Sequence, residues 1–157
     1  MDNKEKLEYG DLAEVSVSYL YKRDLSKSIR ITSPNDASKV AFELMEKETL
    51  GMQEQFVVIY LNRDNKVIGT RKHFIGTLVS VNVDPRIILV TAINLLASSI
   101  ILAHNHPSGN LKPSDCDQKL TRKMIDCCRL VDIEVLDHLI ISPTGNYYGI
   151  ISESKNL

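Results

Sequence analysis

Hydrophobic and polar residues alternate in some parts of the chain and follow a helical spacing in others, which predicts both strands and helices. The segment EVSVSYLY alternates apolar and polar side chains and predicts a short strand over residues 14–21. Within EQFVVIYLNRDNKVIGTRKHF, two runs rich in β-branched and aromatic residues flank a polar turn at 63–66. They predict a β-hairpin whose second strand continues towards Thr77.

Two helix starts are marked by a capping side chain that is followed directly by proline. Ser33 precedes Pro34, and Asp84 precedes Pro85. Serine and aspartate side chains accept hydrogen bonds from the free N–H groups at a helix start, and proline is tolerated at the first helical position. The first pair predicts a helix over 34–48, and the second predicts a helix that begins at 84. The apolar stripe of the first helix would consist of Val40, Leu44 and Leu50.

The second half of the chain continues this mixture. SSIILAHNH predicts a buried strand, SDCDQKLTRKMIDCCRLV a helix, and IEVLDHLIIS and YYGIIS two strands joined by the turn PTGN. The predicted order, β-α-β-β-α-β-α-β-β, indicates an α+β fold bordering on α/β, with a mixed sheet flanked by helices. We expect one domain over 31–157, preceded by an N-terminal extension, 1–30, that carries the short strand.

Net charge and cysteine content indicate which classes of binding partner and which cellular compartment to expect. The 157 residues carry a net charge of −1, whereas domains held to nucleic acid by phosphate contacts have a basic excess, so nucleic-acid binding should be weak or indirect. The three cysteines, without a C-x-x-C pair, favour a reducing compartment over a disulfide framework. With no signal-peptide pattern and no apolar run of about 18 residues, the chain is expected to be cytoplasmic and outside the membrane. The sequence indicates no particular oligomeric state.

The segment LAHNHPSGNLKPSDCD holds the strongest sign of chemistry. His104 and His106 end a predicted strand two positions apart, so both side chains point to one side, with Cα atoms about 6.6 Å apart, while Asn105 points the other way. Asp117, in the first turn of the next helix, could aim back at the strand end. Two histidines and an aspartate suit a catalytic zinc, which keeps a fourth position open. Ser114 and Asp117 also fit a plain helix-capping pair, and this alternative stays open.

A hydrolytic zinc site also needs a general base that takes a proton from the metal-activated water. The candidate carboxylates are Glu54, Glu46, Glu48, Asp84 and Asp137. Glu54 heads the first strand of the hairpin, where a side chain can lie at the end of a sheet. Spacing alone does not select it.

Taken together, Glu54, His104-Asn105-His106, Ser114 and Asp117 resemble the JAMM motif of JAB/MPN metalloproteins. The segments HNHPSG, PSDCD and DHLI more closely resemble the RadC family, and the resemblance covers about residues 30–152. It implies a JAB/MPN-like mixed sheet flanked by helices, related to the cytidine-deaminase-like architecture. It also implies zinc bound by His104, His106 and Asp117, with Glu54 as the base and Ser114 holding the oxyanion of a tetrahedral intermediate.

Two functions follow from this resemblance. The complete set of motif residues favours a zinc-dependent hydrolase of peptidase or isopeptidase type, with a protein or peptide substrate, since eukaryotic relatives with this motif cut isopeptide bonds to ubiquitin-like proteins. The alternative is a non-catalytic JAB-fold module that binds or scaffolds in DNA repair. The helix-hairpin-helix segment usual in RadC-like members is not recognisable before the domain, which weakens DNA binding. A nucleobase deaminase is disfavoured, because the H-x-E and P-C-x-x-C signatures are absent.

The DHLI segment allows two interpretations. Asp137 or His138 could support the metal, since a ligating histidine usually donates its second N–H to a neighbouring group. Neighbours on a strand face opposite sides, so at most one of them can do this. A structural role or a contact with substrate is the alternative. Cys116, next to the motif, is a further candidate ligand.

Overall fold

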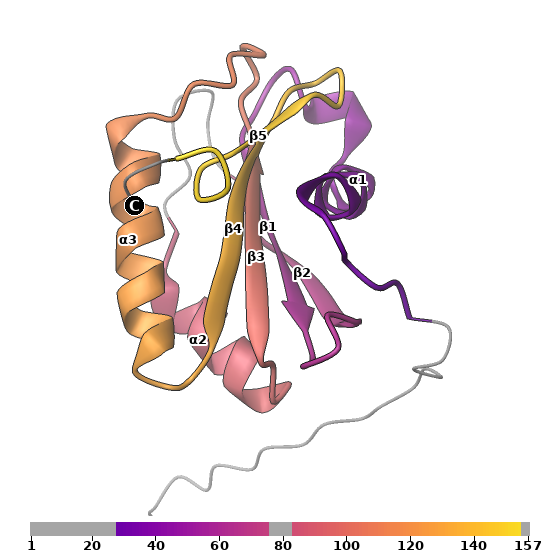
Figure 1. Cartoon of the computed structure of the whole chain (residues 1–157). Helices are drawn as coiled ribbons and strands as arrows, with labels where there is room; N and C mark the ends of the chain where they lie inside the picture. Colours follow the sequence, from indigo (N-terminus) through magenta and orange to yellow (C-terminus); the bar gives the residue numbers. More distant parts are fainter. Residues whose placement is uncertain (1–27, 76–82, 155–157) are drawn as a thin grey trace, which may run out of the picture.

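The computed structural model describes residues 28–75 and 83–154 (Figure 1). Along the chain they form α1 (Pro34–Leu44), a 3-10 helix η3 (Lys47–Thr49), β1 (Gln55–Leu61), β2 (Val67–Ile75), α2 (Pro85–Asn94), β3 (Ser99–Asn105), α3 (Asp115–Arg129), β4 (Glu134–Ile141) and β5 (Tyr147–Gly149). None of the helices in these segments is long and apolar enough to cross a lipid bilayer.

The described strands form one mixed sheet in the order β2-β1-β3-β4-β5. β1 pairs antiparallel with both β2 and β3, and β4 pairs antiparallel with β5. β3 and β4 are parallel, so their carboxyl ends lie at the same edge of the sheet. The loop after β3 leads into α3, which places the start of this helix near that edge (Figure 1).

Helices cover both faces of the sheet, with α1 on one face and α2 and α3 on the other (Figure 1). The core under α1 includes Ala37, Ala41, Val57, Ile101 and Leu139. The core under α2 and α3 includes Ile88, Ala92, Val58, Leu102, Met124 and Cys128. Because β1 and β3 are buried on both faces along their whole length, their sequences are nearly continuous apolar runs.

The predicted helix starts and the predicted fold class are confirmed. The Ser33 hydroxyl accepts a hydrogen bond from the Asp36 N–H, and the Asp84 carboxylate accepts one from the Arg86 N–H. A proline follows each cap, as expected. The mixed sheet with helices on both faces agrees with the α+β prediction.

Two predicted boundaries are wrong. The helix predicted over 34–48 ends at Leu44, because the Glu46 backbone is bound at both its N–H and its carbonyl by the Gln55 side chain of β1. Its buried face is made of Ala37, Ser38 and Ala41, whereas the expected stripe residues Val40 and Leu44 are only partly buried. The strand predicted over 147–152 ends at Gly149, where a turn follows and the Glu153 N–H donates to the Gly149 carbonyl.

Other predictions are not addressed by the structure. The strand predicted over 14–21 and the end of the hairpin at Thr77 lie outside the described residues. The division of the chain into 1–30 and 31–157 stays a prediction.

Candidate metal centre

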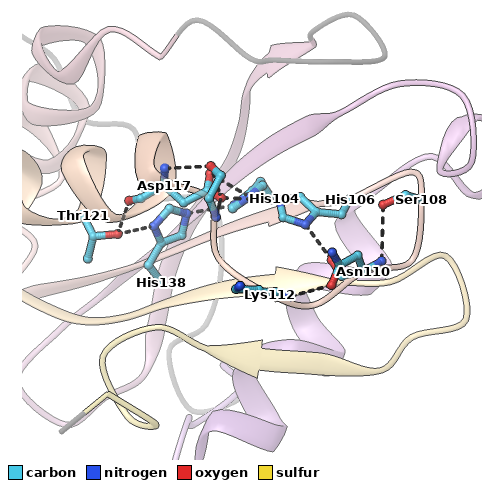
Figure 2. A network of polar contacts seen from close by, with 9 residues as sticks. His104, His106, Ser108, Asn110, Lys112, Asp117, Thr121 and His138 are labelled. Carbon is cyan, nitrogen blue, oxygen red and sulfur yellow. Dashed lines mark hydrogen bonds and ion pairs between the residues drawn. The ribbon is translucent and has the colours of Figure 1, made fainter.

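Three potential metal ligands meet where β3 ends and α3 begins (Figure 2). His104 lies near the end of β3, His106 just beyond it, and Asp117 in the first turn of α3. One ligand atom from each of the three side chains lies within 4.8 Å of the other two. His104 Nε2 is 3.0 Å from His106 Nε2 and 3.2 Å from Asp117 Oδ1. The structure therefore brings together the three residues that the sequence predicted as metal ligands.

His106 is held by the loop that follows it (Figure 2). Its Nδ1 is 2.6 Å from the carbonyl oxygen of Asn110, which can only accept, so Nδ1 carries the proton and Nε2 of the neutral ring keeps a lone pair. The Gly109 N–H closes this loop on the His106 carbonyl, and Gly109 has a φ of 75°, which glycine adopts readily. Side chains also brace the loop: Ser108 accepts from the Asn110 N–H, and Asn110 accepts from the Lys112 N–H.

His104 is held inside the fold. Its Nδ1 is 2.9 Å from Nε2 of His138, a fully buried residue of β4, so His104 Nε2 is the atom that faces the other ligands. The Asp137 carboxylate lies elsewhere, where it accepts hydrogen bonds from the Ser152 hydroxyl and the Ile151 N–H. Of the two residues in the DHLI segment, only His138 touches a candidate ligand, in agreement with the expectation that at most one could.

Asp117 is both a helix-capping residue and a candidate ligand. The backbone N–H and the hydroxyl of Ser114 donate to Asp117 Oδ2 over 2.7 and 2.6 Å, and the Asp117 N–H donates back to the Ser114 hydroxyl. The second carboxylate oxygen, Oδ1, faces His104. The two interpretations of this pair are therefore compatible, because the cap holds Oδ2, which lies 3.5 Å from His106 Nε2, and leaves Oδ1 to face His104. The role of Ser114 towards an oxyanion stays a prediction.

Electrostatics favour a positive charge among these side chains. Burial raises the pKa of Asp117, but its polar contacts with the His104 and His106 rings outweigh burial and hold this pKa well below its usual range. The hydrogen bond to Asp117 raises the pKa of His106, burial opposes this, and the Asn110 carbonyl and the charge of Glu54 add to the rise. Asp117 is therefore an anion, and the site around it attracts a cation.

The donor set fits a divalent metal ion. His104 Nε2 is 3.0 Å from His106 Nε2 and 3.2 Å from Asp117 Oδ1, and His106 Nε2 is 3.5 Å from Asp117 Oδ2. Lone pairs on these atoms repel one another unless a proton or a metal cation lies among them. Imidazole and carboxylate are the ligands of catalytic zinc and of related divalent metals. Within the described part of the chain, no second group of this kind exists. These three residues can therefore bind a metal ion.

Glu54 directly precedes β1, the strand that pairs with β3 beside the histidines. Phe56 of β1 is opposite His104 and stacks on its ring, with centroids 6.2 Å apart. Side chains two positions apart along a strand face the same way, so the alternation of β1 predicts that Glu54, one residue before the strand, faces His106. The effect of the Glu54 charge on the pKa of His106 agrees with this placement. Its role as a base stays a prediction.

The other carboxylates considered as bases lie outside the metal-binding group. Glu46 forms an ion pair with Lys72, Asp84 with Arg86, and Asp137 binds Ser152. Glu48 is exposed in η3. Cys116, the further candidate ligand, is exposed and is not part of the group either.

Asn105 supports the site in a way that sequence reasoning missed. Its buried side chain points away from the histidines, as predicted, and donates to the carbonyls of Leu50 and Gln53 over 2.8 and 3.1 Å. Its oxygen accepts from the Gln55 N–H over 2.7 Å. The residue between the two histidines thus ties the segment on both sides of Glu54 to β3. A polar residue in an otherwise apolar strand was the available signal.

Two more supporting residues were missed. Thr121 contacts His138 and lies four residues after Asp117, hence on the same face of α3. This spacing could have identified it. Asn110 acts on His106 through its backbone carbonyl, for which the side-chain sequence offers no signal.

Comparison with known proteins gives a match to one family model and to curated relatives. Residues 31–156 match the family model of the RadC-like JAB domain. A UPF0758 protein of Photorhabdus laumondii is 42% identical over 127 residues, which cover 80% of this chain and 55% of that protein. A UPF0758 protein of Staphylococcus haemolyticus is 40% identical over 134 residues, which cover 85% of this chain and 57% of that protein. The chain spans a little over half the length of these curated relatives.

Proposed function

Because the chain belongs to the family of RadC-like JAB domains, we propose that it is a zinc-dependent hydrolase that cleaves an amide bond, of peptidase or isopeptidase type. The match to the family model confirms the resemblance to RadC, and the mixed sheet formed by the described strands, with helices on both faces, is consistent with a JAB/MPN fold. The observation that carries the proposal is the convergence of one ligand atom each from His104, His106 and Asp117 within 4.8 Å.

Zinc is proposed because two imidazoles and one carboxylate match its catalytic sites, in which a fourth position is left for water or substrate. A zinc ion held there would lower the pKa of a water molecule to about 7 and polarise the carbonyl of the bond to be cut. Protein purified without chelator should contain about one zinc per chain by elemental analysis, and His104→Ala should lose it. A chain that takes up no zinc even after loading would contradict the proposal.

The residues of the chain itself would move and hold the protons and charges. Glu54 would take a proton from the attacking water and pass it to the leaving amine, as a general base and then a general acid. Ser114 would turn its hydroxyl from Asp117 Oδ2 to the oxyanion of the substrate. Its backbone N–H, which also donates to Asp117 Oδ2, would meanwhile keep the carboxylate in place.

Substitution of Glu54 tests the hydrolase proposal. Glu54→Gln keeps the shape of the side chain but cannot take a proton, so hydrolysis of a panel of peptide and isopeptide substrates should fall by about 10²–10⁴-fold. Zinc content and melting temperature should stay close to those of the wild type. Glu48→Gln is the matched control, because it removes the same charge from an exposed position outside the site. Equal activity of the Glu54 variant and the control would remove Glu54 from the mechanism.

The substrate class, the location and nucleic-acid binding complete the proposal. We propose a protein or peptide substrate, a cytoplasmic location, and weak or indirect nucleic-acid binding. The net charge of −1 supports the last of these. Duplex DNA should bind at physiological salt with a dissociation constant of about 10⁻⁴ M or weaker. Sub-micromolar DNA binding by zinc-loaded protein that cleaves none of the panel would instead favour the non-catalytic DNA-repair module.

A further inference from the structure

His138 reaches the metal centre because β4 contains a bulge. Val135 and Asp137 pair with the consecutive residues Ile100 and Ile101 of β3, so Leu136 is an extra residue in β4. Val135 packs on the side of α2 and α3, and regular alternation from there would turn His138 to the α1 side. The bulge shifts the alternation by one position, so His138 faces His104 instead.

His138 forms the middle of a buried chain of hydrogen bonds (Figure 2). Its Nε2 is 2.9 Å from His104 Nδ1, and its Nδ1 is 2.7 Å from the Thr121 hydroxyl. The Thr121 hydroxyl is in turn 2.6 Å from the Asp117 carbonyl oxygen. His138 and Thr121 are completely buried, so water cannot replace these partners.

The direction of this chain follows from its last acceptor. A carbonyl oxygen only accepts, so the Thr121 hydroxyl uses its single proton on Asp117 and must accept from the Nδ1–H of His138. His138 Nε2 is then the acceptor, and His104 Nδ1 carries the proton. If these hydrogen bonds ran in the opposite direction, the Thr121 hydroxyl would donate to His138. No proton would then lie between the Thr121 and Asp117 oxygens, which are 2.6 Å apart and would repel each other.

We propose that His138 and Thr121 are positioning residues that fix His104 as the Nδ1–H tautomer and thereby keep its Nε2 lone pair available for the metal. The inference rests on the metal site of the proposed function. His138 meets His104 Nδ1 with its own Nε2 inside the completely buried part of the chain of hydrogen bonds. A carboxylate often accepts from a ligating histidine. A histidine ring in this place also accepts from the ligand but adds no negative charge beside the metal.

Thr121 offers the sharpest test, because it touches no proposed ligand atom. In Thr121→Val the His138 Nδ1–H loses its acceptor. The hydrogen bond between the two histidines should then reverse, so that His138 Nε2–H donates to His104 Nδ1. The proton of His104 moves to its Nε2, where it can donate to Asp117. The metal must then displace that proton, and zinc affinity should fall by about 10–100-fold. Thr121→Ser keeps the hydroxyl and should bind zinc as the wild type does. Competition with a chromophoric chelator measures both affinities.

Melting temperature separates this role from a merely structural one. Thr121→Ser loses a buried methyl group, and Thr121→Val loses buried hydrogen bonds, so both variants should melt below the wild type. A merely structural role would make zinc affinity follow melting temperature in both variants. Equal zinc affinities of the two variants would overturn the inference.

The tautomer can also be observed without metal. In chelator-treated protein labelled with ¹⁵N-histidine, long-range ¹H–¹⁵N spectra should show the His104 proton on Nδ1 in the wild type and on Nε2 in Thr121→Val. A proton on His104 Nε2 in the wild type would overturn the inference. Failure of the proposed function would give a different result. If the wild type binds zinc but cleaves no substrate, and the Thr121 variants still differ in zinc affinity, the hydrolase proposal is contradicted and the positioning roles of His138 and Thr121 are kept.

Discussion

The two histidines of the site are two residues apart but are held in different ways. His104 lies in a central strand, is 3% exposed, and contacts a buried side chain of the neighbouring strand. His106 lies beyond the strand end, is partly exposed, and contacts a backbone carbonyl of the loop that follows. The orientation of His104 is therefore coupled to the core of the protein, and that of His106 to the conformation of one loop. The same ligand type is stabilised by tertiary packing in one case and by local turn chemistry in the other.

Removal of each histidine should expose this difference most strongly. Both His104→Ala and His106→Ala should abolish tight zinc binding, because only two ligands remain. In metal-free protein, His104→Ala should lower the free energy of unfolding by about 2–4 kcal/mol, because it leaves a buried gap and an unpaired His138 nitrogen. His106→Ala should lower it by less than about 1 kcal/mol. Urea unfolding in chelator measures both values, and equal losses would contradict the comparison.

Substitution of Asn105, whose side chain lies on the other face of β3, should have the second-largest effect on stability. Asn105→Ala leaves the Leu50 and Gln53 carbonyls and the Gln55 N–H without their partner, which should lower stability by about 1–3 kcal/mol. Zinc content per folded chain should persist, because the histidines point the other way. Hydrolysis should fall by about 10–100-fold, because Glu54 is no longer held in register. Activity, zinc content and hydrogen exchange of residues 50–55 are the measurements.

A matched control for Asn105 lies at the far end of the same hairpin. The Asn62 side chain accepts from the N–H groups of Asp64 and Lys66 in the turn between β1 and β2. Asn62→Ala should therefore lower stability but leave activity per folded chain unchanged. If both asparagine variants lose activity to the same extent, Asn105 does not position Glu54 specifically.

Features governed by local chemistry could be predicted from the sequence. The caps at Ser33 and Asp84 precede prolines, and both helices begin where this pattern places them. The positions of His104, His106 and Asp117 relative to a strand end and a helix start also predicted that they would meet. Each of these inferences needs only the period of a strand or the first turn of a helix.

Features that depend on contacts between distant segments could not be predicted. Nothing in the sequence around Met45 ends α1, because the residue that binds the Glu46 backbone, Gln55, belongs to β1. The bulge that turns His138 towards His104 appears only when β4 is paired with β3. The sequence could limit the Asp137–His138 pair to one supporting residue, but the bulge decides which.

Two glycines in similar turns offer the finest comparison. The N–H groups of Gly109 and Gly145 each close a turn on the carbonyl three residues earlier, and their φ values are 75° and 87°. A Cβ atom at either position would meet nothing closer than 3.7 Å, so alanine is disfavoured by backbone conformation and not by a clash. Each Gly→Ala variant should lower the free energy of unfolding by about 1–2 kcal/mol. Only Gly109→Ala should also weaken zinc binding, by less than about 10-fold, because its loop presents the Asn110 carbonyl to His106. Urea unfolding and chelator competition on both variants test this. Unchanged zinc affinity in Gly109→Ala, with the expected loss of stability, would show that His106 does not depend on its loop for orientation.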